Sequence, residues 1–285
     1  MQHSEQVMGT VVSLSLAAEA TTTDDAWGGG SAGDGPAGFG SAGEGPAGLA
    51  PDNPATVALA RAIVALHEAD RVFSTWKPQS PMSRLRRGEI GLDEAPPEVA
   101  EVLELCRRAR DASGGWFDPW RMPGGVDPTG LVKGWAAERA LAALRGSGAH
   151  AGMVNAGGDI AVFGEPAPGE SWRIGVQDPR YEDRVLCVVE LFGDGAVATS
   201  GTYQRGFHVV DPETESPASG LLAATVVGPS LAFADALATG LLASGGQALE
   251  RVTANEGYTA LVVDTDGRMR ATPGFPVAVD LALAS

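Results

Sequence analysis

The order of helical and strand-like segments constrains the fold of this chain more than any other feature of its sequence. Helical periodicity marks residues 54–73, 97–113, 130–144 and 232–243, so three of the four helices come early, and strand-like segments dominate the second half. This grouping is typical of an α+β protein rather than a regular βαβ array. No GxGxxG follows a predicted strand, and no P-loop occurs. We therefore expect one domain over residues 1–285, with packed helices and mixed, largely antiparallel sheets.

Short strands are expected along most of the remaining chain. They are predicted at 8–16, 153–154, 160–163, 172–176, 185–191, 196–200, 207–210, 223–227, 258–263 and 276–279. Residues 26–53 differ, because they are rich in Gly, Ala, Ser and Pro, and residues 30–39 are repeated almost verbatim as 40–49. Two polar copies are too few for a solenoid, so we expect a disordered loop that carries no chemistry.

The charge balance limits the classes of partner. A formal net charge of -16 argues against nucleic-acid binding, which needs a basic patch, and against docking on anionic membranes. An acidic enzyme that handles a polyanion needs local cations or backbone amides, which points to a metal. Residues 1–6 carry no signal-peptide pattern, and no apolar run of about 18 residues occurs. We therefore expect a cytoplasmic protein without membrane insertion.

The strongest candidate for a metal site is the segment 234–240. Asp235 and Thr239 stand four residues apart among small apolar residues, so on a helix their side chains share one face, one turn apart. A carboxylate and a hydroxyl are hard oxygen donors, which suit Mg²⁺. The alternative is that Asp235 only caps the start of a helix.

Several other segments carry side chains suited to a ligand, and each has an ordinary structural explanation. Lys133 lies near a helix start, where a cation is unfavourable unless an anion such as phosphate is bound, or the residue is simply solvated. Asn155–Ile160 contains paired glycines, which predict a tight turn or a close approach of backbone amides to a ligand. Thr199–Thr202 is expected to form a turn. His208, at a strand position, is a structural histidine or a proton acceptor near neutral pH.

Taken in order, these segments resemble the ApbE-type FAD:protein FMN transferases over nearly the whole chain except the Gly-rich insert. The matching segments are Met8-Gly9-Thr10, Phe73-Ser74-Thr75-Trp76 with Ser80, Gly115-Trp116-Phe117-Asp118-Pro119, Asp127 with Gly130 and Lys133-Gly134, Asn155-Ala156-Gly157-Gly158-Asp159-Ile160, Trp172 with Gly175 and Asp178-Pro179, Ala198-Thr199-Ser200-Gly201, His208-Val209-Val210-Asp211-Pro212 and Ala234-Asp235-Ala236-Leu237-Ala238-Thr239. Pro128, Val132 and Trp120 depart from the family pattern.

The resemblance implies an ApbE-like fold and a specific reaction. FAD is the donor substrate; its pyrophosphate is cleaved, FMN passes to a threonine hydroxyl of an acceptor protein, and AMP leaves. The resemblance implies Mg²⁺ held by Asp235, Thr239 and the carbonyl oxygens of Gly130 and Ala238. It also implies an FAD site lined by Met8, Trp76, Trp116, Phe117, Asp118, Asp127, Lys133 and Val209. His208 is the candidate for removing the threonine proton, with Asp159 as second candidate.

Two other functions fit the same residues. An FAD pyrophosphatase would use water in place of the threonine, and a non-catalytic flavin-binding protein would carry FAD unchanged. Separately, residues 266–272 loosely resemble a flavin-acceptor pattern around Thr272. The Asp-Gly pair there favours a hairpin turn instead.

Overall fold

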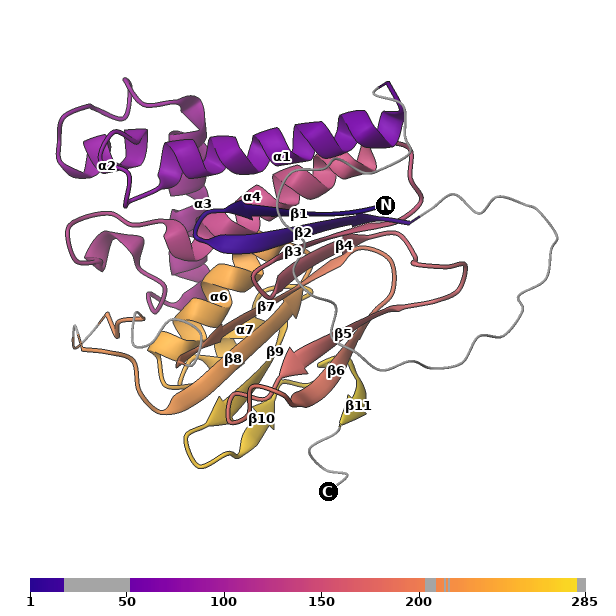
Figure 1. Ribbon diagram of the computed structural model, residues 1–285. Helices are drawn as coiled ribbons and strands as arrows, with labels where there is room; N and C mark the ends of the chain where they lie inside the picture. The colour runs from indigo at the N-terminus through magenta and orange to yellow at the C-terminus, as the bar shows by residue number, and fades with distance from the viewer. Residues whose placement is uncertain (18–51, 203–208, 213, 215, 281–285) are drawn as a thin grey trace.

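The fold is described from a computed structural model, for residues 1–17, 52–202, 209–212, 214 and 216–280 (Figure 1). The Gly-rich loop predicted at 26–53 therefore lies outside the described residues, except for its last two positions. His208 and the first two residues of the strand predicted at 207–210 also lie outside them.

Two antiparallel sheets form the β part of the molecule. The larger sheet has eight strands in the order β1-β2-β3-β4-β7-β8-β9-β10, and the smaller has three in the order β11-β6-β5. All the strand pairs in both sheets are antiparallel. The strands are β1 Gln2–Val7, β2 Thr10–Leu16, β3 Gly152–Ala156, β4 Asp159–Phe163, β5 Trp172–Gln177, β6 Val185–Leu191, β7 Gly195–Gly201, β8 Leu221–Gly228, β9 Thr259–Asp264, β10 Met269–Ala271 and β11 Val277–Asp280.

The longer helices pack against one face of the larger sheet. They are α1 Pro54–Phe73, α3 Pro97–Ser113, α4 Thr129–Arg145 and α6 Leu231–Ala243, with the shorter α2 Pro81–Arg86, α7 Leu249–Thr253 and a 3₁₀ turn, η1 Pro119–Arg121. Figure 1 shows α1 and α4 on one side of this sheet and β5, β6 and β11 on the other. The main core fills the helix side, and a smaller apolar core fills the space between the two sheets. Strand β8 is consequently buried on both faces.

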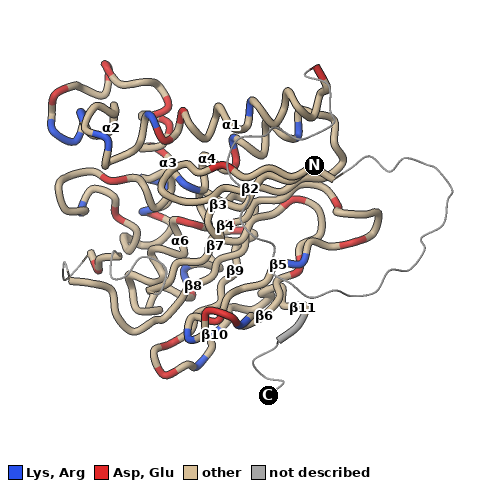
Figure 2. Tube along the Cα trace, in the orientation of Figure 1, with Lys and Arg blue, Asp and Glu red and all other residues tan. Residues whose placement is uncertain are grey.

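Local sequence signals account for the helix boundaries. Asn53 caps α1 through a 2.9 Å hydrogen bond from the Ala55 amide, and Pro54 follows at the first helical position. Helix α3 ends at Gly114, whose φ of 70° is the left-handed conformation that glycine adopts readily. Charged residues lie mainly on loops and outer helices, and few lie on the central strands (Figure 2). None of the helices among the described residues is long and apolar enough to cross a membrane.

The α+β class and the antiparallel sheets predicted from the sequence are confirmed, and so are the four helices. Three local predictions need correction. The strand expected at 8–16 begins only at Thr10, because Met8 and Gly9 adopt φ of 54° and 71° and form the turn of the β1–β2 hairpin. The turn expected at 199–202 belongs mostly to strand β7. Within the described part of 207–210, Val210 forms only an isolated bridge with Pro217.

Candidate active site at the seam of α4 and α6

Helices α4 and α6 meet so closely that their relative position is fixed. A side chain at Gly134 would place its Cβ 2.5 Å from the Leu231 carbonyl oxygen, so only glycine fits there. One turn further along α4, the Glu138 carboxylate accepts hydrogen bonds from the amides of Leu231 and Ala232. These bonds satisfy free N–H groups at the start of α6. Burial raises the pKa of Glu138, although its hydrogen bonds act in the opposite direction.

The start of α6 already has its cap, which decides between the two interpretations of Asp235. The N-cap residue is Ser230, whose hydroxyl accepts a hydrogen bond from the Phe233 amide at 3.4 Å. Asp235 lies one turn inside the helix and is only 4% exposed. It therefore does not cap α6, and its carboxylate lies in the protein interior.

Three charged side chains converge between α4 and the sheet. Asp159 and Asp235 are both buried. The Lys133 ammonium forms an ion pair with Asp159 and lies 3.9 Å from Asp235 Oδ1. One cation thus lies close to two buried carboxylates, in surroundings where charge interactions are stronger than in water.

The β3–β4 hairpin determines where Asp159 lies. Its two-residue turn has Gly157 and Gly158 at φ of 63° and 101°, which confirms the predicted tight turn. The first residue of β4 is Asp159, which is 1% exposed. Its Oδ1 accepts a 2.9 Å hydrogen bond from the Thr199 amide of β7, while Oδ2 faces Lys133. Both oxygens of this carboxylate are therefore engaged.

A pair of hydroxyl groups continues the site where α6 meets β7. Thr239 lies one turn beyond Asp235, and its hydroxyl is 3.2 Å from that of Ser200 on β7. Gly130, in the first turn of α4, faces Thr239: a Cβ at this glycine would lie 3.5 Å from Thr239 Oγ1 and 3.2 Å from the Phe117 ring. The absence of a side chain at Gly130 keeps the space beside the Thr239 hydroxyl free.

A pocket opens beside these oxygens. Seven of the predicted site residues line it: Trp116, Phe117, Asp118, Asp127, Gly130, Val209 and Thr239. Its other lining residues are Pro119, Arg121, Met122, Thr129, Val210, Pro212 and Ala243. Aromatic and apolar side chains with a few polar groups are typical of a small-molecule site.

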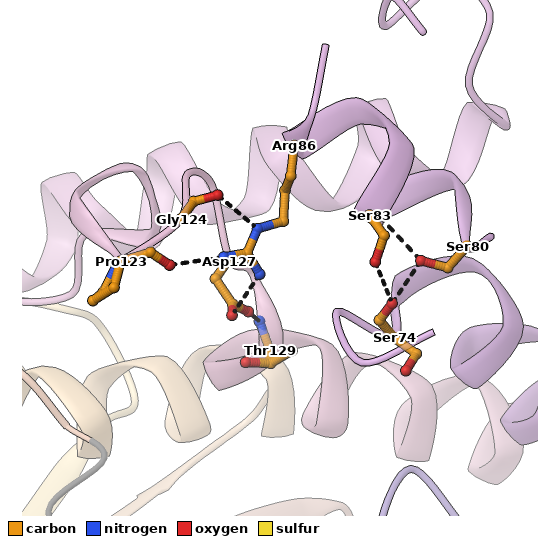
Figure 3. Close-up of polar contacts among 8 residues, drawn as sticks. All are labelled: Ser74, Ser80, Ser83, Arg86, Pro123, Gly124, Asp127 and Thr129. Carbon is orange, nitrogen blue, oxygen red and sulfur yellow. Dashed lines mark hydrogen bonds and ion pairs between the residues drawn. The ribbon is translucent and has the colours of Figure 1, made fainter. Parts of the chain in front are cut away.

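Asp118 and Asp127 are held in place by neighbouring cations. Asp118 accepts a hydrogen bond from the Trp120 amide at 3.0 Å, and its other oxygen lies 3.0 Å from Arg110 Nε. Asp127 pairs with Arg86 at 3.1 Å and accepts a hydrogen bond from the Thr129 amide (Figure 3). Neither arginine was predictable from the sequence, because each belongs to a run of charged residues that is typical of a solvated surface.

The remaining predicted site residues lie elsewhere or are not described. Trp76 is 93% exposed, and Met8 packs partly against the main core; neither lines the pocket. Ala238 is completely buried in α6. Helical carbonyls point toward the C-terminal end, whereas the side chains of Asp235 and Thr239 tilt the other way, so Ala238 is the least supported of the predicted ligands. His208 lies outside the described residues, directly before Val209 of the pocket.

A family model and several known proteins match this chain. The sequence model of the ApbE family matches residues 8–123 and 120–262. The chain belongs to the ApbE family. Two relatives named FAD:protein FMN transferase, from Rhodobacter capsulatus and Vibrio cholerae, are 33% and 32% identical to it over 157 and 151 residues. These matches cover 52% and 50% of this ApbE-family chain, but 30% and 45% of the relatives, so the chain matches less than half of their length.

Solved structures show the same fold. The ApbE protein of Thermotoga maritima superposes with a TM-score of 0.77 at 22% identity, over 96% of this chain and 97% of the other. The flavin transferase ApbE of Vibrio cholerae superposes with a TM-score of 0.75 at 20% identity, over the same shares. At these identities the likeness establishes the ApbE fold alone.

Proposed function

We propose that this chain is a Mg²⁺-dependent FAD:protein FMN transferase. The observation that carries the proposal is that the Thr239 hydroxyl faces Gly130 in a pocket also lined by Trp116 and Phe117, one helical turn from buried Asp235. Membership of the ApbE family and the names of the relatives support the flavin donor. A cytoplasmic location and a threonine-bearing acceptor protein remain predictions from the sequence.

The donor atoms at the seam fit Mg²⁺. Within the described part of the chain, no group of three or more His, Cys, Asp or Glu side chains is arranged to hold a metal. The proposed site is of another kind: the Asp235 carboxylate and the Thr239 hydroxyl would bind the ion, with the Gly130 carbonyl oxygen that the family resemblance implies. The Ala238 carbonyl, which the resemblance also implies, is directed along α6 away from these side chains. Such hard oxygen donors suit Mg²⁺, which often keeps waters and binds substrate phosphates. When bound, the ion would neutralise negative charge on the pyrophosphate.

The reaction joins the acceptor threonine to the FMN half of FAD. A bond forms between the threonine oxygen and the FMN phosphorus, the bond from this phosphorus to the oxygen of AMP breaks, and the threonine proton passes to a base. Lys133 supplies positive charge near the phosphates, and Asp159 holds its ammonium in position. Because one Asp159 oxygen accepts a hydrogen bond from Thr199 and the other forms the ion pair with Lys133, we favour His208 as the base. Trp116 and Phe117 provide apolar surface for a planar ring.

A single assay separates the transferase from its two alternatives. The protein is incubated with FAD and Mg²⁺, with and without a candidate acceptor protein that has an exposed threonine. Flavin fluorescence on the denatured acceptor, with an equal amount of AMP, is the expected result. Free FMN and AMP in both samples would indicate a pyrophosphatase instead. Unchanged FAD that remains bound to the protein would indicate a carrier.

A further inference from the structure

Arg86 links the end of helix α2 to the loop that leads into α4 (Figure 3). Its guanidinium makes three contacts: Nη1 with Asp127 Oδ2 at 3.1 Å, Nε with the Gly124 carbonyl at 3.2 Å, and Nη2 with the Pro123 carbonyl at 2.8 Å. These contacts use all three nitrogens of the planar guanidinium group, an arrangement of donors that lysine does not have. One side chain thereby holds a loop that lies about 40 positions further along the chain.

The pair of Arg86 and Asp127 is shielded from water. The two side chains are 14% and 16% exposed, whereas the pair of Arg87 and Glu89 on the same turn is 43% and 48% exposed. Exposed pairs contribute little, because water and salt screen them. Removal of one partner from a shielded pair leaves the other charge without compensation, which is more disruptive.

The loop is shaped around the guanidinium. Gly124 has a φ of 81°, and a Cβ at this position would lie 3.0 Å from Arg86 Nη2. Farther along, the Asp127 amide donates a 2.8 Å hydrogen bond to the Pro119 carbonyl. Glycine at this positive φ lets the backbone carbonyls turn toward the arginine. The loop is therefore closed over Arg86 and fastened at its far end to η1.

Helix α2 is itself anchored, so Arg86 has a fixed base. Ser80 caps the helix by accepting a 3.0 Å hydrogen bond from the Ser83 amide. The hydroxyls of Ser80 and Ser83 both donate to the Ser74 carbonyl, at 2.5 and 3.1 Å (Figure 3). Both serines are buried. This network ties the start of α2 to the end of α1 and limits the movement of Arg86.

The residues that Arg86 holds are pocket residues. Asp127 directs one oxygen to Arg86 and the other to the Thr129 amide, and Met122, Asp127, Thr129 and Gly130 line the pocket. We propose that Arg86 is a positioning residue for FAD: it fixes this wall of the pocket without lining the pocket itself. That the ligand is FAD rests on the proposed function. That Arg86 holds residues 122–129 in place does not depend on it.

The test compares Arg86→Gln and Arg86→Lys with the matched control Arg87→Gln in the full chain. We expect Arg86→Gln to raise KM for FAD by about tenfold with kcat within about twofold, because a misplaced wall weakens substrate and transition state alike. Arg86→Lys should behave similarly, since an ammonium cannot reproduce the fork. Arg87→Gln should match the wild type. Amide hydrogen exchange of residues 122–129 should become faster in both Arg86 variants and remain unchanged in the control.

The outcomes separate this proposal from the proposed function. Wild-type turnover of FAD with an unchanged KM in both Arg86 variants would overturn the positioning role and leave the transferase intact. Unchanged exchange in the loop would also overturn it. A wild-type protein that does not turn over FAD would refute the transferase, and loop exchange with FAD affinity measured by fluorescence would then decide the role of Arg86. If Arg86→Gln does not fold, Arg86→Lys provides the same comparisons.

Discussion

The Ser200 hydroxyl lies 3.2 Å from the Thr239 hydroxyl and so joins strand β7 to helix α6 at the candidate metal site. The contact matters because it holds the Thr239 side chain beside the pocket, where its oxygen would bind the proposed Mg²⁺. Neighbouring hydrogen bonds of this kind typically orient a metal ligand and raise its effectiveness.

Thr239→Val tests the hydroxyl directly. Valine keeps the shape of the side chain and removes its oxygen, so we expect Mg²⁺-dependent FAD turnover to fall by about 10- to 100-fold with little change in thermal stability. Thr225→Val is the matched control: it removes another buried hydroxyl, which pairs with Thr199 at 3.0 Å, and should leave turnover unchanged. Equal activity of Thr239→Val and the wild type, measured as AMP release, would exclude Thr239 as a ligand.

Asp235→Asn tests the only side-chain carboxylate proposed for the ion. The amide is close in size but carries no charge, so we expect turnover to fall on the order of 100-fold and the Mg²⁺ concentration for half activity to rise. A titration of AMP release against Mg²⁺ measures both. Asp194→Asn, which alters an exposed carboxylate paired with Arg145, is the control. An unchanged Mg²⁺ dependence in Asp235→Asn would contradict the assignment.

Gly130→Ala separates the requirements of the fold from those of the pocket. Alanine favours a helix by about 0.5–1 kcal/mol over glycine, which offsets the 3.2 Å contact with the Phe117 ring. We therefore expect the free energy of unfolding to change by no more than about 1 kcal/mol. The new methyl group narrows the space beside Thr239, so KM for FAD should rise several-fold. A large loss of stability, measured by urea denaturation, would mean that packing alone requires this glycine.

Glu138→Ala should weaken the start of α6. The variant leaves the Leu231 amide without its carboxylate acceptor, at a cost of about 1–3 kcal/mol in the free energy of unfolding. Glu138→Gln retains an acceptor oxygen and should lose less. Thermal unfolding of the two variants and the wild type measures the order, and equal loss in both variants would show that the charge of Glu138, rather than its acceptor oxygen, is what stabilises α6.

Glu138 should also give stability a specific pH dependence. Burial raises its pKa above the ordinary value of 4.5, so the folded protein holds this proton more tightly than the unfolded chain does. Stability from this group is present below pH 4.5 and is lost as pH rises through the raised pKa. We expect the Tm of the wild type to fall relative to Glu138→Gln between pH 4.5 and neutral pH. A constant difference across this range would contradict the pKa shift.

Signals that act over one or two turns of chain were predictable from the sequence. Apolar spacing gave the ranges of α1 and α3, and the separation of Asp235 from Thr239 placed both on one helix face. The paired glycines predicted the β3–β4 turn. The hairpin expected around Asp266 is also confirmed, and Thr272 is buried there, with its hydroxyl bonded to the backbone of Ala260.

The features that the sequence did not reveal depend on contacts between distant segments or on weak local patterns. The Ser200–Thr239 contact spans 39 positions and the Arg86–Asp127 pair spans 41, and neither has a local signature. Strand β1 is an edge strand with a mostly polar sequence, so it lacks the apolar alternation that marks a strand. The turn at Met8 was missed because a methionine seldom adopts a positive φ.

The two-glycine turn between β3 and β4 makes the site sensitive to loop length. Side chains alternate between the two faces of a sheet, and Asp159 is the first residue after the turn. If one residue were gained or lost in this turn and the strand pairing shifted to match, the Asp159 carboxylate would move to the opposite face of the sheet, away from Lys133. The number of residues in this turn is therefore as important to the site as the identity of Asp159 itself.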